Sequence, residues 1–348
     1  MFITSFFLVV FFSSFCCTIL ATHWIVVWVF IELSTLSMVP LLSARAVPRS
    51  IEATSKYFIF QAVASIILLL GIFVNFVSYN SFLLLGPYNG LSLAIIIIAL
   101  GIKLGTFPGH FWFIDVMSGL SFSECFFSAV LSKIIPFYIL LIIVANEVEF
   151  LYIIMGMGSI LLGSFVGLKQ NQLRKLLALS SVAHMGWLLI IMPLGSFAVV
   201  WSLFIIYIIM VSPIFNLCNS FSHNSLSQNS STSRSRIALL VLIILFLSLG
   251  GLPPFLGFFY KWVIFFINIK SGNYLISIFL VLMSLVSLFF YINVCYNIYC
   301  IYWPSTKLIG DLRGYSTPWA SSFIITSGVI VSASLLFVGP MMGWLLLL

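Results

Sequence analysis

The chain has 348 residues, of which 63% are hydrophobic and 6% charged, with a formal net charge of +7. Soluble domains carry about 25% charged residues, so this composition excludes a water-soluble globular protein and predicts one that lies in a membrane. No run of lysine and arginine follows the pattern of a phosphate-binding groove, so nucleic acid is not an expected partner. The basic excess instead indicates loops on the positive side of a membrane.

Apolar runs recur along the whole chain, and a membrane-crossing helix needs about 20 such residues. Between polar or Gly/Pro-marked turns, the sequence predicts eleven membrane helices, at 2–20, 24–42, 56–79, 90–117, 121–144, 150–168, 177–194, 197–219, 237–267, 273–302 and 320–346. The seventh, 177–194, is the weakest of them because it is short and contains Ser180, Ser181 and His184. The fold class that follows is an all-α polytopic membrane protein.

Loop charges test this count, because an odd number of crossings places the two termini on opposite sides. The loops on the N-terminal side hold the basic residues Arg45, Arg49, Lys56, Lys169, Arg174, Lys175, Arg234, Arg236, Lys307 and Arg313. The other side holds Lys270 and the acidic pair Glu147 and Glu149. The positive-inside rule therefore predicts an N-terminus on the matrix or cytoplasmic side. No basic residue precedes the first apolar run, MFITSFFLVVFF, which therefore resembles neither a secretory signal nor a transit peptide.

Four charged residues do not fit in the loops between the apolar runs: Glu32, Lys103, Lys133 and Lys261. Each costs about 2.5–3.5 kcal/mol at the centre of a bilayer, so such residues usually mark an ion or proton path. Lys103 or Lys261 could instead reach the interface from a helix end. Glu32 and Lys133 lie too deep within their runs for that explanation to be favoured.

Helix breakers surround two of these lysines. They are Gly101, Gly105, Pro108 and Gly109 near Lys103, and Gly250, Gly251, Pro253, Pro254 and Gly257 near Lys261. Interrupted helices at corresponding positions of two halves indicate the ion site of a transporter. The interrupted helices are the fourth and the ninth, which predicts inverted five-helix repeats at 1–145 and 146–302, followed by a loop and an eleventh helix at 303–348. The correspondence is incomplete, because Lys103 precedes its break whereas Lys261 follows its break.

Two histidines in apolar surroundings, His184 and more weakly His110, are candidates for proton relay, because histidine titrates near operating pH. The alternative is a structural histidine that bonds the backbone. The six cysteines show no CxxC or Cys/His metal spacing. No dinucleotide, Walker or iron–sulfur motif is present either, so we expect this chain to bind no metal or cofactor.

Five segments carry a specific resemblance: WVFIELSTLSMVPLL, SIEATSKYFIFQAVAS, GIKLGTFPGHFWFIDVMSGL, LSSVAHMGW and LSLGGLPPFLGFFYKW. In this order they resemble the chain 2 family of mitochondrial NADH–ubiquinone oxidoreductase, whose members are antiporter-like subunits of respiratory complex I. The resemblance covers most of the chain and weakens after about residue 270. Chains 4 and 5 are similar in this core but considerably longer, so length favours chain 2.

The resemblance implies a role for each intramembrane charge. Glu32 matches the family's membrane glutamate, and Lys103 matches the lysine of the first broken helix. The resemblance implies that Glu32 and Lys103 form a switchable pair. Lys133 matches the central lysine, and Lys261 the lysine of the second broken helix, where the proton leaves or passes onward. The resemblance also implies the mitochondrial inner membrane, surrounding lipids, and neighbouring membrane-arm subunits such as chains 4 and 4L.

The expected function is therefore proton translocation coupled to NADH:ubiquinone electron transfer, with no redox chemistry in this chain itself. The resemblance places NADH, FMN, iron–sulfur clusters and ubiquinone elsewhere in the complex. The chief alternative is a free-standing cation/proton antiporter that uses the same charges to exchange Na⁺ or K⁺ for protons. A purely structural scaffold fits poorly, because it predicts no lysine inside the membrane.

Overall fold

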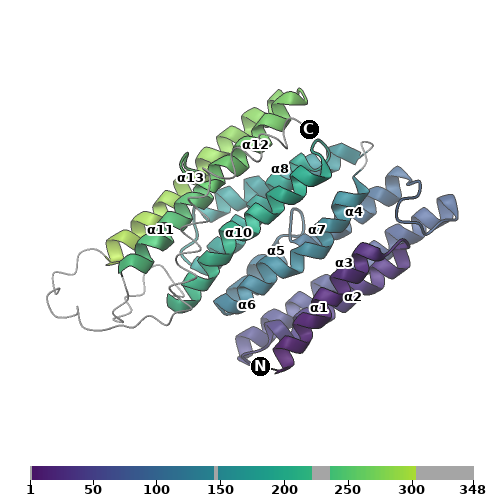
Figure 1. Ribbon diagram of the computed structural model, residues 1–348, viewed down its shortest axis with the longest axis horizontal. Helices are drawn as coiled ribbons and strands as arrows, with labels where there is room; N and C mark the ends of the chain where they lie inside the picture. The colour runs from purple at the N-terminus through teal and green to yellow at the C-terminus, as the bar shows by residue number, and fades with distance from the viewer. Residues whose placement is uncertain (1, 145–147, 222–235, 303–348) are drawn as a thin grey trace. The chain divides into compact units, whose positions relative to one another are not determined.

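The computed structural model describes residues 2–144, 148–221 and 236–302 (Figure 1). These residues form helices joined by short turns, without a β-strand among them, which confirms the predicted all-α class. Within the described ranges, 7 helices are long and apolar enough to cross a membrane by length and composition. The predicted eleventh helix, 320–346, lies outside the described residues, so the total of eleven stays a prediction.

The chain divides into two compact units by packing. The first holds Met1–Gly163 and Leu177–Trp201, and the second holds the described parts of Ser164–Leu176 and Ser202–Leu348. This is a division of spatial contacts and does not bear on repeat symmetry. The predicted inverted repeats at 1–145 and 146–302 stay a prediction.

Most of the first unit consists of apolar helices whose backbone groups are paired internally, as a membrane requires. Its elements up to residue 143 are α1 (Phe2–Leu20), α2 (Trp24–Leu42), α3 (Pro48–Tyr79), α4 (Gly90–Leu104), α5 (Phe111–Gly119), α6 (Phe122–Phe126), the π-helical segment η1 (Phe127–Leu131) and α7 (Ser132–Ile143). α3 starts eight residues before the predicted start at 56. Pro48 is well suited to a first helical turn, and the exposed ion pair between Glu52 Oε1 and Lys56 Nζ, 2.6 Å apart, stabilises the added turns.

The helix predicted least securely at 177–194 is observed as α9 (Leu173–Ile191), which packs beside α8 (Glu149–Gly167). Residues 176–192 are all buried, so α9 lies inside the protein, where its polar side chains do not meet lipid. The two backbones approach closely at two levels. A Cβ added at Gly163 would lie 2.7 Å from the Leu179 carbonyl oxygen, and one added at Gly186 would lie 2.7 Å from that of Gly156.

The remaining helices belong wholly or mainly to the second unit: α10 (Phe197–Phe221), α11 (Arg236–Gly250), α12 (Leu256–Lys270) and α13 (Tyr274–Tyr302). α13 packs against both α11 and α12, and the three lie side by side in Figure 1. Both long predicted runs are interrupted as expected. The run 90–117 divides into α4 and α5, and the run 237–267 divides into α11 and α12.

Candidate functional site

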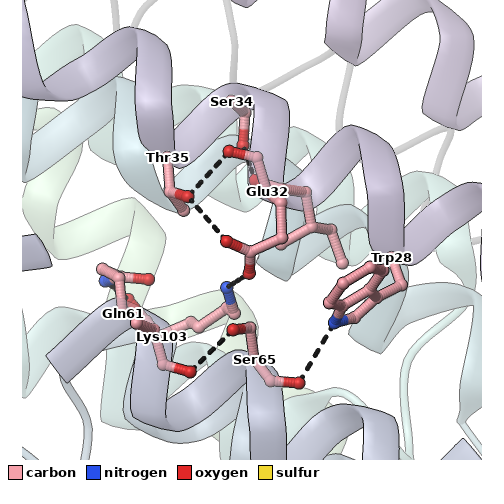
Figure 2. A network of polar contacts seen from close by, with 9 residues as sticks. Trp28, Glu32, Ser34, Thr35, Gln61, Ser65 and Lys103 are labelled. Atoms are coloured by element: carbon pink, nitrogen blue, oxygen red, sulfur yellow. Dashed lines mark hydrogen bonds and ion pairs between the residues drawn. The ribbon is translucent and has the colours of Figure 1, made fainter. Parts of the chain in front are cut away.

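A buried lysine and a carboxylate, Lys103 and Glu32, meet in the first unit, and the family resemblance implies this pair. Lys103 Nζ lies 3.5 Å from Glu32 Oε1, with the Lys103 side chain fully buried and that of Glu32 23% exposed (Figure 2). The Thr35 hydroxyl lies 3.5 Å from Glu32 Oε2 and donates a shorter bond of 2.8 Å to the Glu32 carbonyl oxygen. Charge-assisted bonds usually span about 2.7–2.9 Å, so both contacts of this carboxylate group are long and it is held loosely.

A helix end frees the carbonyl groups of its last turn, and at the end of α4 the Gly105 N–H bonds those of Gly101 and Ile102. Gly105 at φ +71° turns the chain, and Thr106 donates both its backbone N–H and its hydroxyl to the Gly101 carbonyl at 3.0 Å. The Trp112 indole N–H donates to the Ile102 carbonyl at 2.9 Å, and the Gln61 side-chain amide donates to the Lys103 carbonyl at 3.2 Å. The turn at Gly105 and Thr106 and side chains of α3 and α5 therefore satisfy this break together, and the Lys103 ammonium is left to face Glu32.

The break after α11 is organised around its lysine. The chain turns at Gly251 with φ +83°, and Lys261 on α12 donates from Nζ to the Gly250 carbonyl at 2.8 Å. The same Nζ donates to the Ser287 hydroxyl on α13 at 3.1 Å. Because the C-terminal end of a helix carries partial negative charge, the C-terminus of α11 is a fixed counter-charge for this lysine.

Burial decides between the two explanations that the sequence leaves open for Lys103 and Lys261. Their residues are 1% and 5% exposed, so neither side chain reaches out of the protein towards an interface. A buried lysine needs acceptors or a counter-charge, and each has them. The structure therefore does not support snorkelling for either residue.

Lys133 is fully buried at the start of α7. Its Nζ lies 4.4 Å from the centroid of the Phe113 ring, which is the geometry of a cation–π contact. Gly105 allows this approach, because a Cβ there would lie 2.9 Å from Phe113 Cβ. The break in the first long run thus places an aromatic face beside the central lysine.

The helix predicted at 121–144 is not uniform, because the π-helical segment η1 precedes Lys133 directly. Here the Ser132 N–H bonds the carbonyl of Phe127, five residues earlier, in place of the usual four. Such wide turns are frequent at functional sites. Nothing in the residue pattern of this run distinguishes it from an ordinary helix.

Both candidate histidines are buried. His110 is 3% exposed and lies in the first break, with its ring centroid 3.9 Å from that of Phe111 and 6.5 Å from that of Phe107. His184, also 3% exposed, lies on α9. Their relay role stays a prediction. The first unit contains Glu32, Lys103, Lys133 and both histidines, whereas Lys261 belongs to the second.

Four contributing residues were missed by sequence reasoning: Thr35, Gln61, Phe113 and Ser287. Gln61 was discoverable, because an amide inside an apolar run needs a buried partner. Thr35, Phe113 and Ser287 are of residue types that recur along the chain, and only their contacts in the folded protein distinguish them. Among the described residues, no group of three His, Cys, Asp or Glu side chains could hold a metal ion.

A polytopic helical protein with two broken helices and a buried lysine beside each break has the features of an antiporter-like membrane subunit. The comparisons agree with that class. The family model described as "NADH:quinone oxidoreductase/Mrp antiporter, TM" matches residues 21–287. NADH-ubiquinone oxidoreductase chain 2 of Oryctolagus cuniculus is 34% identical over 93% of this chain and 93% of its own length. That of Patiria pectinifera is 37% identical over 82% and 81%. The chain belongs to the NADH-ubiquinone oxidoreductase chain 2 family.

Solved structures show the same fold at lower identity. A chain of respiratory complex I from Thermus thermophilus with bound aureothin matches with a TM-score of 0.84 and 23% identity, covering 97% of this chain and 79% of that one. A chain of the Mrp complex from Dietzia sp. matches with a TM-score of 0.74 and 19% identity, covering 84% and 59%. These structures show the fold, and the family model and the curated relatives confirm the family resemblance read from the motifs.

Proposed function

We propose that this chain is a proton-translocating membrane-arm subunit of respiratory complex I, in the mitochondrial inner membrane with its N-terminus on the matrix side. The observation that carries the proposal is the burial of three lysines, Lys103, Lys133 and Lys261, which are 1%, 0% and 5% exposed. Buried charges of this kind are expensive and are retained for function. The family's NADH-ubiquinone oxidoreductase activity supplies the driving reaction.

The proposed mechanism starts at the loose pair of the first unit. Burial disfavours the charged form of a lysine, and a nearby carboxylate favours it. Movement of Glu32 towards or away from Lys103 would therefore change whether Lys103 keeps its proton. Lys133 and Lys261 would respond in turn through charge repulsion, with His184 and more weakly His110 as relays.

This chain would itself carry out no electron transfer. NADH, FMN, iron–sulfur clusters and ubiquinone would act in other subunits, and the energy would reach this chain through its membrane neighbours, for which we propose chains 4 and 4L. Lipids would cover the remaining apolar surface. The matched test is co-purification: we expect the chain to run on a native gel within a large assembly that has NADH dehydrogenase activity.

The alternative is a free-standing cation/proton antiporter, which the fold match to an Mrp complex favours. In that case the chain would run apart from NADH dehydrogenase activity and would exchange Na⁺ or K⁺ for protons in vesicles. The curated relatives at 34% and 37% identity over most of the chain bear the name of the oxidoreductase, and this supports the first proposal.

Lys133 provides the decisive test of the mechanism. Lys133→Met keeps length and apolarity and removes the proton-carrying group, so the complex should assemble while proton pumping and coupled ubiquinone reduction fall at least tenfold. Lys133→Arg keeps a positive charge beside Phe113, but arginine does not release its proton in a protein. It should therefore also be impaired. Normal pumping by the Arg variant in reconstituted vesicles would make Lys133 a fixed counter-charge and refute the mechanism.

A further inference from the structure

A second acidic residue, Glu124, is buried inside the first unit and has no part in the mechanism above. It is 3% exposed, and it is the one carboxylate in the described ranges that the protein buries almost completely. By comparison, Glu32 is 23% exposed and Glu52 is 63% exposed at the side chain. A buried carboxylate is as costly as a buried lysine, so its retention calls for a reason.

The two oxygens of Glu124 are in different situations. Oε2 accepts a hydrogen bond of 2.9 Å from the backbone N–H of Ser121, which caps the start of the helical segment. Oε1 is buried and accepts no hydrogen bond from any described residue. No described cation forms an ion pair with this carboxylate either. One oxygen therefore anchors the side chain, and the other keeps lone pairs open for a proton.

The position of Glu124 connects it with Lys133. Both lie on the membrane-crossing segment Phe122–Ile143, and they are nine positions apart in the sequence. At 1.5 Å per residue this is about 13 Å along the helix axis. In the proposed topology, the segment enters the membrane from the matrix side. Glu124 therefore lies between the matrix and the central lysine.

Hydroxyl groups continue the polar character of the segment between these two residues. Ser128, one turn after Glu124, is fully buried and donates to the Cys125 carbonyl at 3.0 Å. Ser132, one turn further, donates to the Ser128 carbonyl at 2.6 Å. The wide turns of η1 lie in the same stretch. This spacing repeats a polar group on every turn from Glu124 to the residue that precedes Lys133.

We propose, on the basis of the proposed function, that Glu124 is the proton-loading group for Lys133. Oε1 takes a proton from water on the matrix side, which converts the carboxylate to a carboxylic acid. The acid then passes the proton, through water beside Ser128, to the neutral amine of Lys133. The products are a carboxylate and an ammonium, and the bond between Oε2 and Ser121 is kept throughout.

Glutamine separates this role from that of a simple helix cap. Glu124→Gln keeps the shape of the side chain and an oxygen that can accept from the Ser121 N–H, but it cannot carry a proton. Glu124→Asp keeps the acid on a shorter side chain. Glu52→Gln, which changes an exposed carboxylate on α3, is the matched control for loss of one negative charge. All variants are studied in the intact complex, with rates expressed per assembled complex.

We expect Glu124→Gln to lower the kcat of ubiquinone reduction and the rate of proton pumping at least fivefold. The KM for ubiquinone and the thermal stability of the complex should not change. Glu124→Asp should retain at least half of the wild-type rate, and Glu52→Gln should match the wild type. If Glu124 were only a helix cap, Glu124→Gln should pump at the wild-type rate, because the amide oxygen replaces the carboxylate oxygen.

Wild-type pumping by Glu124→Gln would overturn the proposal and leave Glu124 a helix cap. A parallel loss of stability and rate in both the Gln and the Asp variants would overturn it as well. Lys133→Met distinguishes this failure from failure of the proposed function. If Lys133→Met stops pumping while Glu124→Gln does not, only the loading role is wrong. If Lys133→Met pumps normally, the central mechanism itself fails.

Discussion

The two broken helices differ in how the carbonyl groups freed at each break are hydrogen-bonded. In the first, side chains of α3 and α5 satisfy the freed carbonyl groups, and the Lys103 ammonium faces Glu32 across 3.5 Å. In the second, Lys261 itself donates to the freed carbonyl of Gly250 at 2.8 Å. The difference follows from sequence position, because Lys103 precedes its break and Lys261 follows its break. One lysine therefore faces the carboxylate of a side chain, and the other is bonded to a backbone carbonyl at the end of a helix.

This difference predicts unequal costs when each lysine is removed. Lys103→Met leaves Glu32 largely buried without its cation, which should destabilise the complex at the lower end of about 3–5 kcal/mol, because that carboxylate keeps some exposure. Lys261→Met leaves a carbonyl without a donor and should cost about 1–3 kcal/mol. Thermal unfolding of the assembled complex measures both. Both variants should also lose proton pumping.

The double variant Glu32→Gln/Lys103→Met is the control for this comparison. Removing both charges should restore most of the stability that Lys103→Met loses, while pumping stays low. Equal destabilisation by Lys103→Met and Lys261→Met, with no recovery in the double variant, would show that the pair has no energetic coupling.

Gly251→Ala should also impair the protein, because it strains the backbone at the second break and places a methyl group against Lys261. A left-handed conformation costs a non-glycine residue about 1–2 kcal/mol. The new Cβ would also lie 3.0 Å from Lys261 Cδ. Gly272→Ala is a close control, since Gly272 has a similar φ of +81° but no atom within 4 Å of an added Cβ. Reconstituted vesicles should show reduced pumping for Gly251→Ala only. Equal pumping by the two variants would contradict the contact with Lys261.

Gln61→Leu tests the first break. Leucine fills similar space but gives no hydrogen to the Lys103 carbonyl, so we expect a loss of about 1–3 kcal/mol in stability. Gln61→Glu offers only an acceptor when ionised and should be at least as harmful. Unchanged thermal unfolding for Gln61→Leu would mean that another group satisfies this carbonyl.

Ser287→Ala should give the smallest effect, because Lys261 keeps its bond to Gly250. Loss of one ordinary hydrogen bond is worth about 0.5–1.5 kcal/mol, or roughly a two- to tenfold change in a rate it controls. Ser284→Ala, one turn earlier, removes a hydroxyl that donates to Val281 on its own helix. Pumping rates should fall for Ser287→Ala and not for Ser284→Ala. The reverse order would exclude Ser287 as a positioning residue.

Much of the fold could be predicted from sequence, because charges, glycines and prolines stand out in an apolar chain. Glu32 and Lys103 were identified this way, as were the breaks beside Lys103 and Lys261. The contacts that give these residues their surroundings could not be predicted. The Gly250 carbonyl that receives Lys261 is a backbone group with no residue signature, and the ring of Phe113 is one phenylalanine of 36. The wide turn at η1 leaves no mark on an apolar pattern.

The close approach of α8 and α9 constrains how His184 can act. Backbones that touch near Gly163 and again near Gly186 can neither slide nor rock without a clash, since two separate points fix both spacing and tilt. His184 stands between these two levels on α9, so we expect its Cα to move little when neighbouring charges change. If His184 relays a proton, we therefore expect its own contribution to be rotation of the imidazole ring, while other groups bring the proton to it and take it away.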